Sequence, residues 1–173
     1  GAVIPMAWWF AIPAAIAIPF AGVVTLATAI NQRWHLIPAV EDVDRNSYGT
    51  TAYGLAITTL LVMYWPYQPE AVCAGVLVMA CGDGLAGLIG RAVTSPRWTV
   101  AGQTKSLAGT ATMLTVSFGV LLALTITDGS GAKGTGALLL ATVATGLEQI
   151  SPAGIDNLSV PLAVGFLWAT TIH

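Results

Sequence analysis

Long apolar segments alternate with short polar ones along almost the whole chain. A membrane-spanning helix needs about 20 mainly apolar residues, with some allowance for tilt and for a thin bilayer. Six segments meet this requirement, the last two of them being short: residues 8–30, 51–67, 71–90, 106–127, 134–147 and 158–172. The pattern predicts an all-α fold, a polytopic membrane helical bundle of about six transmembrane helices in a single domain over residues 1–173.

Composition agrees with a membrane protein. Hydrophobic residues make up 55% of the 173 residues and charged residues only 8%, which lies outside the usual range of soluble domains. The formal net charge of −2 and the lack of a Lys/Arg-rich run give no sign of a nucleic-acid partner. Cys73 and Cys81 share one apolar segment, so we expect reduced, buried thiols rather than a disulfide. The sequence does not predict an oligomeric state.

The basic residues indicate the orientation of the bundle. Positive charges concentrate in cytoplasmic loops of membrane proteins. In the predicted topology Lys133 is the one basic residue on the opposite side, and five lie on one side: Arg33, Arg45, Arg91, Arg97 and Lys105. We therefore expect this side to face the cytoplasm. Most acidic residues fall on the same side, which predicts a polar site open to the cytosol.

Asp83 is the most informative single residue. It lies inside a predicted span, where an ionisable side chain is costly unless it faces protein or a wet cavity. Gly82 and Gly84 flank it and would let a backbone or a ligand approach closely. We interpret Asp83 as a metal ligand. The alternative is a buried hydrogen bond between helices.

A second cluster occupies residues 102–110, where a polar loop becomes an apolar helix. Free N–H groups at the start of a helix, together with the ammonium of Lys105 and the hydroxyl of Ser106, suit phosphate oxygens. The glycine spacing is not that of a P-loop. Taken alone, Lys105 could equally be an interfacial lysine whose stem covers apolar surface.

A third cluster covers residues 148–161. Glu148, Asp156 and an amide lie around a Pro/Gly turn between two predicted spans, and such oxygen ligands are those that Mg²⁺ prefers. The alternative is a solvated loop in which Asp156 or Asn157 caps the last helix.

The three clusters contain motifs in a fixed order: Gly82-Asp83-Gly84-Leu85-Ala86, then Lys105-Ser106 with Gly109-Thr110, then Glu148 followed by Asp156-Asn157-Leu158-Ser159-Val160-Pro161-Leu162. In order and spacing these motifs resemble the phytol kinase branch of the CTP-dependent polyprenol kinase family, of which dolichol kinase and the CTP-dependent diacylglycerol kinase are more distant members. The similarity covers most of the chain from about Glu41 onward.

The resemblance implies CTP-dependent phosphorylation of a long-chain isoprenoid alcohol, with phytol as the first candidate, giving the alcohol monophosphate and CDP at a plasma or thylakoid-type membrane. Its implied cofactor is Mg²⁺. The implied roles are catalysis for Asp83 and Glu148; metal binding for Asp83, Glu148 and Asp156; and nucleotide binding for Lys105, Ser106, Gly82, Gly84 and Asn157. Such chemistry depends mainly on positioning and charge neutralisation, so metal ligands and a cation are the groups it needs.

Two other functions stay open from the sequence. A lipid cytidylyltransferase would also need CTP, a metal ion and a membrane. A small transporter or structural membrane subunit would use Asp83 as an ion site or proton relay. The chain also departs from the resemblance, because family members usually begin with a helix that carries Arg-Lys and a histidine. Nothing similar precedes Trp8, which leaves room for a seventh helix missing from the N-terminal side.

Overall fold

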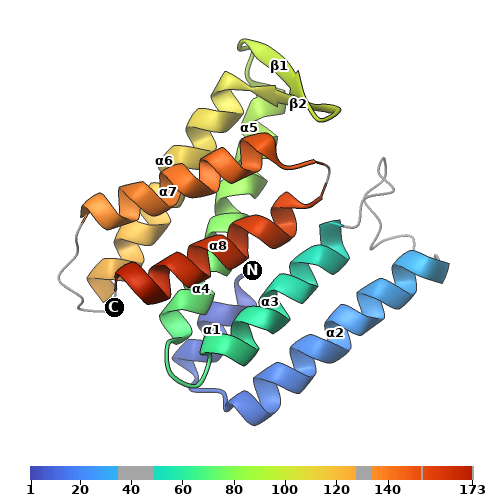
Figure 1. Ribbon diagram of the computed structural model, residues 1–173, viewed down its shortest axis with the longest axis vertical. Coiled ribbons are helices and arrows are strands. Elements are labelled where there is room, and N and C mark those ends of the chain that lie inside the picture. Colours follow the sequence, from blue (N-terminus) through green and yellow to red (C-terminus); the bar gives the residue numbers. More distant parts are fainter. Residues whose placement is uncertain (35–48, 128–133, 153, 173) are drawn as a thin grey trace.

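The computed structural model describes residues 1–34, 49–127, 134–152 and 154–172, which form a bundle of packed helices (Figure 1). The prediction of an all-α membrane bundle is confirmed. The elements in chain order are α1 (Val3–Trp9), α2 (Ala14–Trp34), α3 (Gly49–Tyr64), α4 (Pro69–Leu77), the π-helical turn η2 (Val78–Asp83), α5 (Gly84–Ala92), β1 (Arg97–Val100), β2 (Gln103–Ser106), α6 (Leu107–Thr127), α7 (Gly134–Ile150) and α8 (Asp156–Thr171).

Three of the described helices are long and apolar enough to cross a membrane: Ala14–Trp34, Pro69–Ala92 and Leu107–Ile126. The second is α4, η2 and α5 running as one helix of 24 residues. The helix α3 is apolar but shorter, while α7 and α8 have 17 and 16 residues. The figure of six spans therefore stays a prediction.

The first predicted span, residues 8–30, is wrong as a single helix. The chain breaks between α1 and α2, where Ala11 has a left-handed backbone (φ 50°) and Pro13 can donate no backbone hydrogen bond. The break is held by Trp65, whose indole Nε1 donates to the carbonyl of Ile12 at 2.9 Å. A carbonyl left free by the lost helical bond thereby finds a partner, as a membrane interior requires.

A wider turn interrupts the central helix. Residues Val78–Asp83 form a π-helical turn, a feature that is rare and frequent at functional sites. Gly82 lies in this turn against α6, and a Cβ at Gly82 would stand 2.6 Å from Ser117 Oγ and 2.8 Å from Met113 Sδ. The absence of a side chain at Gly82 thus lets the two helices approach at the level of Asp83.

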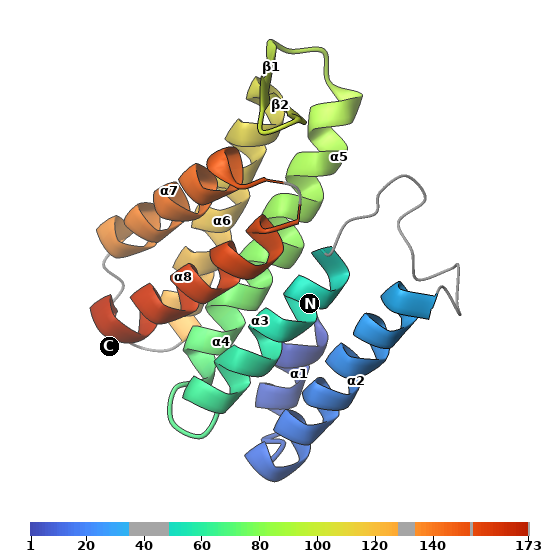
Figure 2. The ribbon, with the colours of Figure 1, turned by 45° about the vertical axis from the view of Figure 1, so that its right-hand side comes forward.

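A β-hairpin replaces the loop that the sequence predicted before α6. The strands β1 and β2 pair antiparallel, from Arg97 with Ser106 to Val100 with Gln103. Ala101 (φ 49°) and Gly102 (φ 78°) are both left-handed, as a two-residue type I′ turn requires. The strand β2, which contains Lys105, leads directly into α6 (Figure 2).

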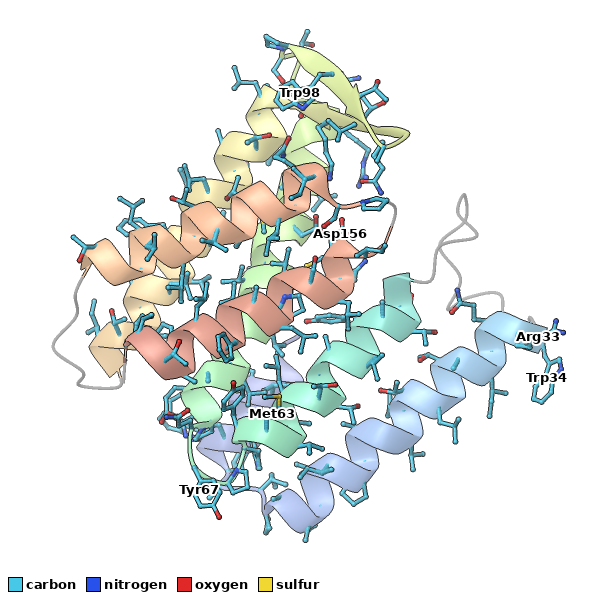
Figure 3. The ribbon with its side chains drawn as sticks, in the orientation of Figure 1. Arg33, Trp34, Met63, Tyr67, Trp98 and Asp156 are labelled. Carbon is cyan, nitrogen blue, oxygen red and sulfur yellow. The ribbon has the colours of Figure 1, made fainter. Side chains whose placement is uncertain are left out.

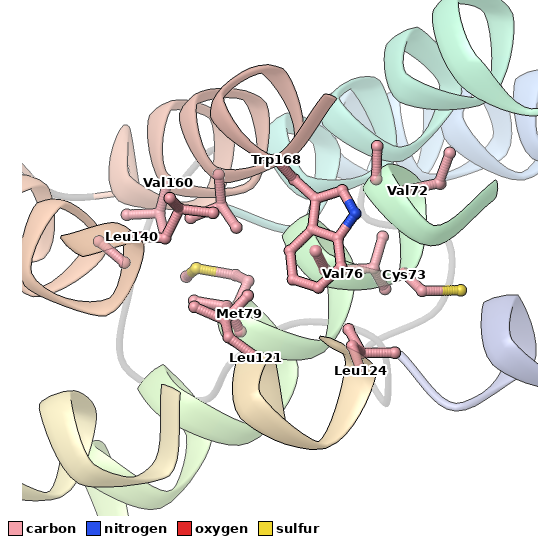
Figure 4. Close-up of a cluster of buried hydrophobic side chains, with 14 of the residues drawn as sticks. Val72, Cys73, Val76, Met79, Leu121, Leu124, Leu140, Val160 and Trp168 are labelled. Carbon is pink, nitrogen blue, oxygen red and sulfur yellow. The ribbon is translucent and has the colours of Figure 1, made fainter. Parts of the chain in front are cut away.

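The apolar core forms where α4 meets α8. Figure 4 shows the indole of Trp168 beside Val72, Cys73 and Val76, with Met79 and Leu121 below it. Trp168 is fully buried, so it anchors the last helix to the central one. Cys73 and Cys81 are free thiols, as expected, but only Cys73 is buried, since Cys81 is partly exposed.

Close packing at this contact predicts a clear effect on stability. A Cβ at Gly75 of α4 would lie 2.4 Å from the backbone oxygen of Pro161 in α8. Because a backbone atom cannot rotate away, Gly75→Ala should lower the free energy of unfolding by about 1–3 kcal/mol. Gly119→Ala in α6 is the control, since no heavy atom lies within 4 Å of its Cβ position. Thermal unfolding in detergent measures both, and equal midpoints would contradict this contact.

Candidate active site

The polar end of the bundle gathers segments that are distant in sequence. The hairpin, the start of α6, the end of α7 and the start of α8 lie together at one end in both ribbon views (Figures 1 and 2). Arg91 lies in the last turn of α5 and Arg97 begins β1 at the same end. Arg45 and Lys133, which also entered the orientation argument, lie outside the described residues. The predicted convergence of the second and third clusters is therefore present.

A buried ion pair joins these two clusters. The Nζ of Lys105, in β2, pairs with Oε1 of Glu148, in α7. Lys105 is only 9% exposed and Glu148 only 6%. Two interpretations from the sequence are thereby corrected: Lys105 does not extend into solvent at an interface, and Glu148 lies within a helix rather than in a solvated loop. Charges this buried need a partner, because desolvation of each is costly.

The second carboxylate oxygen of Glu148 is also held. Nε2 of Gln149 lies 2.6 Å from Glu148 Oε2 and 2.9 Å from Thr110 Oγ1. This small network links β2, α6 and α7 around the ion pair. The sequence analysis assigned no role to the Gln149–Thr110 contact. The only indication of it in the sequence is that both residues are polar and lie near the ends of apolar helices.

Asp156 belongs to the same polar end. It is buried, begins α8 at the connection from α7 (Figure 3), and accepts the backbone N–H of Asn157 at 3.0 Å. Burial raises the pKa of the Asp156 carboxyl above its ordinary value, while the N–H of Asn157 and the Lys105 ammonium act in the opposite direction. Asp156 thus lies within the electrostatic field of the ion pair, and Asn157 is half-buried beside it.

The start of α6 differs from its prediction. The sequence suggested free N–H groups for phosphate, but the first three already have acceptors: Leu107 N binds the Pro96 carbonyl at 3.0 Å, Ala108 N binds Ser95 Oγ at 3.2 Å, and Gly109 N binds Ser106 Oγ at 3.1 Å. Ser106 is therefore a helix cap. A nucleotide-binding role for Ser106 stays a prediction, and the N–H groups of these three residues are not free to share it.

Asp83 lies on the central helix, directly before α5. It is half-buried at the end of η2, which packs against α6 and α8. Gly90 of the same helix lies beside Ser106, and Asp83 is seven residues earlier, about 10 Å along the axis at 1.5 Å per residue. Gly82 faces α6, whereas Gly84 is exposed and its Cβ position has nothing within 4 Å.

The carboxylates do not form a three-ligand metal site. Over residues 1–34, 49–127, 134–152 and 154–172, no three His, Cys, Asp or Glu side chains are placed to hold one ion. Asp83, Glu148 and Asp156 are thus not gathered around a single point. Magnesium that is bound largely through substrate phosphates needs only one or two protein carboxylates. Asp156, with Glu148 beside it, fits that smaller donor set.

Comparison with known proteins identifies the family. No protein-family model matches the chain, and no solved structure matches it. The chain is 38% identical over 178 residues to the phytol kinase of Synechocystis sp., an alignment that covers 98% of this chain and 74% of that protein. The alignment includes the hairpin and the helices that carry Lys105, Glu148 and Asp156. The protein described here therefore belongs to the phytol kinase family.

Proposed function

We propose that the protein is a membrane-embedded kinase that transfers the γ-phosphoryl group of CTP to a long-chain isoprenoid alcohol, phytol being the first candidate. The products would be the alcohol monophosphate and CDP. The observation that carries the proposal is the buried pair of Lys105 and Glu148, with Asp156 in its field, at one end of an apolar bundle. Similarity to a phytol kinase supports the choice of alcohol.

The chemistry requires positioning and neutralisation of phosphate charge. Lys105 supplies the cation, and Glu148 with Gln149 fixes its position through the contacts described above. The alcohol oxygen attacks the γ-phosphorus, the bond to the β–γ bridging oxygen breaks, and CDP leaves. Asp83, at the end of η2, orients the hydroxyl and accepts its proton. The apolar helices offer the isoprenoid tail an environment like that of lipid.

Magnesium has a defined place in this proposal. Asp156 and Glu148 would hold it together with the nucleotide phosphates, and Asn157 would lie against the same nucleotide. A bound magnesium ion neutralises phosphate charge. The orientation follows from the described basic residues: Arg91, Arg97 and Lys105 share one end, so we place this end at the cytoplasmic face of a plasma or thylakoid-type membrane.

A product assay tests the proposal. Purified protein in detergent with CTP, Mg²⁺ and phytol is expected to form phytyl phosphate and CDP in equal amounts, as measured by mass spectrometry and nucleotide chromatography. Omission of the alcohol serves as the control. Absence of product with phytol, farnesol and geranylgeraniol would overturn the proposal. Release of pyrophosphate from CTP and a lipid phosphate would instead identify a cytidylyltransferase.

A further inference from the structure

Gln103 is a buried polar residue without a polar partner. It is 6% exposed, and its side-chain amide makes no hydrogen bond with any residue that the structure describes. Its backbone pairs with Val100 next to the hairpin turn, so the strand fixes its position. Its amide atoms keep some contact with the surface, because among the described residues the one buried side-chain polar atom without a partner is Nε1 of Trp168. The Gln103 amide is therefore unpaired within the protein and open to a ligand.

The strand directs Gln103 toward the polar site. Gln103 and Lys105 are buried while Thr104, between them, is exposed. Residues two apart on a strand share a face, and on this face Lys105 meets Glu148. Gln103 therefore lies on the same side of the hairpin as the ion pair, about 7 Å along the strand from Lys105. The other amide at the site, Gln149, is already engaged by Glu148 and Thr110.

We propose that Gln103 binds the hydrogen-bonding edge of the nucleotide base while Lys105 binds the phosphates; this inference rests on the proposed function. A side-chain amide carries an acceptor oxygen beside donor hydrogens. Cytosine presents the complementary pair, an amino donor at N4 and an acceptor at N3. Phosphate oxygens present acceptors alone and would give the Gln103 oxygen no partner. The base edge is thus the ligand group that satisfies both halves of the amide.

The variant Gln103→Met tests this assignment, because methionine keeps the length and flexibility of glutamine without its amide. We expect kcat/KM for CTP to fall by about 5- to 150-fold through a higher KM for CTP, which is the discrimination that one paired base edge contributes. The KM for phytol should not change. The thermal midpoint without nucleotide should stay the same, because the substitution removes no hydrogen bond within the described part of the protein. Thr104→Val, on the exposed face of the same strand, is the matched control and should behave like the wild type.

A nucleotide panel separates the base from the phosphates. Gln103→Met should reduce the preference among CTP, UTP and ATP, and Gln103→Glu, which keeps the shape but lacks the donor, should also weaken CTP. An equal fall for all three nucleotides would assign Gln103 to the phosphates and overturn the inference. A lowered midpoint or unchanged CTP kinetics would overturn it as well. Calorimetric titration with CTP alone applies the same test without turnover. If the wild type binds CTP but phosphorylates no alcohol, the proposed function is wrong while this inference still stands.

Discussion

Replacing Lys105 by methionine is expected to lower the free energy of unfolding by about 3–5 kcal/mol, because Glu148 would keep a buried charge without its cation. Glu148→Leu should lower the free energy of unfolding by a similar amount, because Lys105 would then keep a buried charge without its carboxylate partner. The double variant Lys105→Met/Glu148→Leu should recover most of the loss, since two apolar side chains of similar volume can replace a buried pair at little cost. Denaturant unfolding in micelles, arranged as a double-mutant cycle, measures the coupling.

The double variant also separates folding from catalysis. It should be folded and yet inactive with CTP, because the cation that neutralises the phosphates and one proposed magnesium ligand, Glu148, are both gone. Arg91→Met is the control: it removes a positive charge from an exposed position at the same end, and surface changes of this kind usually alter stability by no more than about 0.5 kcal/mol. A stable double variant that still turns over CTP would remove Lys105 from the mechanism.

The variant Asp83→Asn is expected to lose phosphoryl transfer by a factor of about 10²–10⁴, the usual contribution of a positioned general base. Asparagine preserves the shape of the side chain and one oxygen, so the π-helical turn should persist. Product formation from phytol gives the rate, and calorimetric titration shows whether CTP still binds, as it should if Asp83 acts on the alcohol.

A neighbouring position provides the matched control for Asp83. Cys81→Ala changes a partly buried free thiol two residues earlier in the same turn and should keep the wild-type rate. Full activity of Asp83→Asn would exclude Asp83 from catalysis. Loss of CTP binding in that variant would move Asp83 to the nucleotide instead of the alcohol.

The helices were predictable because apolar segments of about 20 residues leave few other structures in a bilayer. The hairpin was not, since residues 97–106 form two strands of only four residues each and show little hydrophobic alternation. Its one local signal, Ala101-Gly102, is weaker than the Asn-Gly or Asp-Gly pairs typical of such turns. The break before α2 was missed because proline is tolerated within membrane helices.

The site was predictable in part for a similar reason. Lys105, Glu148 and Asp156 were identifiable because charges are rare in this chain, and the structure brings them to one end. The predicted group of three metal-binding carboxylates was not found among the described residues, because the sequence does not fix how neighbouring helices pack and therefore does not fix the distances between their side chains. Gln103 was missed, since a neutral amide in an apparent loop carries no signal until the strand gives it a face.

The ion pair also bears on how the protein is made. Lys105 and Glu148 are separated by 43 residues, so at translation rates of about 5–20 residues per second the lysine emerges from the ribosome roughly 2–9 seconds before its partner. During this interval its ammonium must remain in water or among lipid headgroups, since burial without a counter-charge is unfavourable. The hairpin can settle onto the bundle only after α7 has been synthesised. Insertion of α7 and α8 is then the step at which Lys105 and Glu148 become buried together.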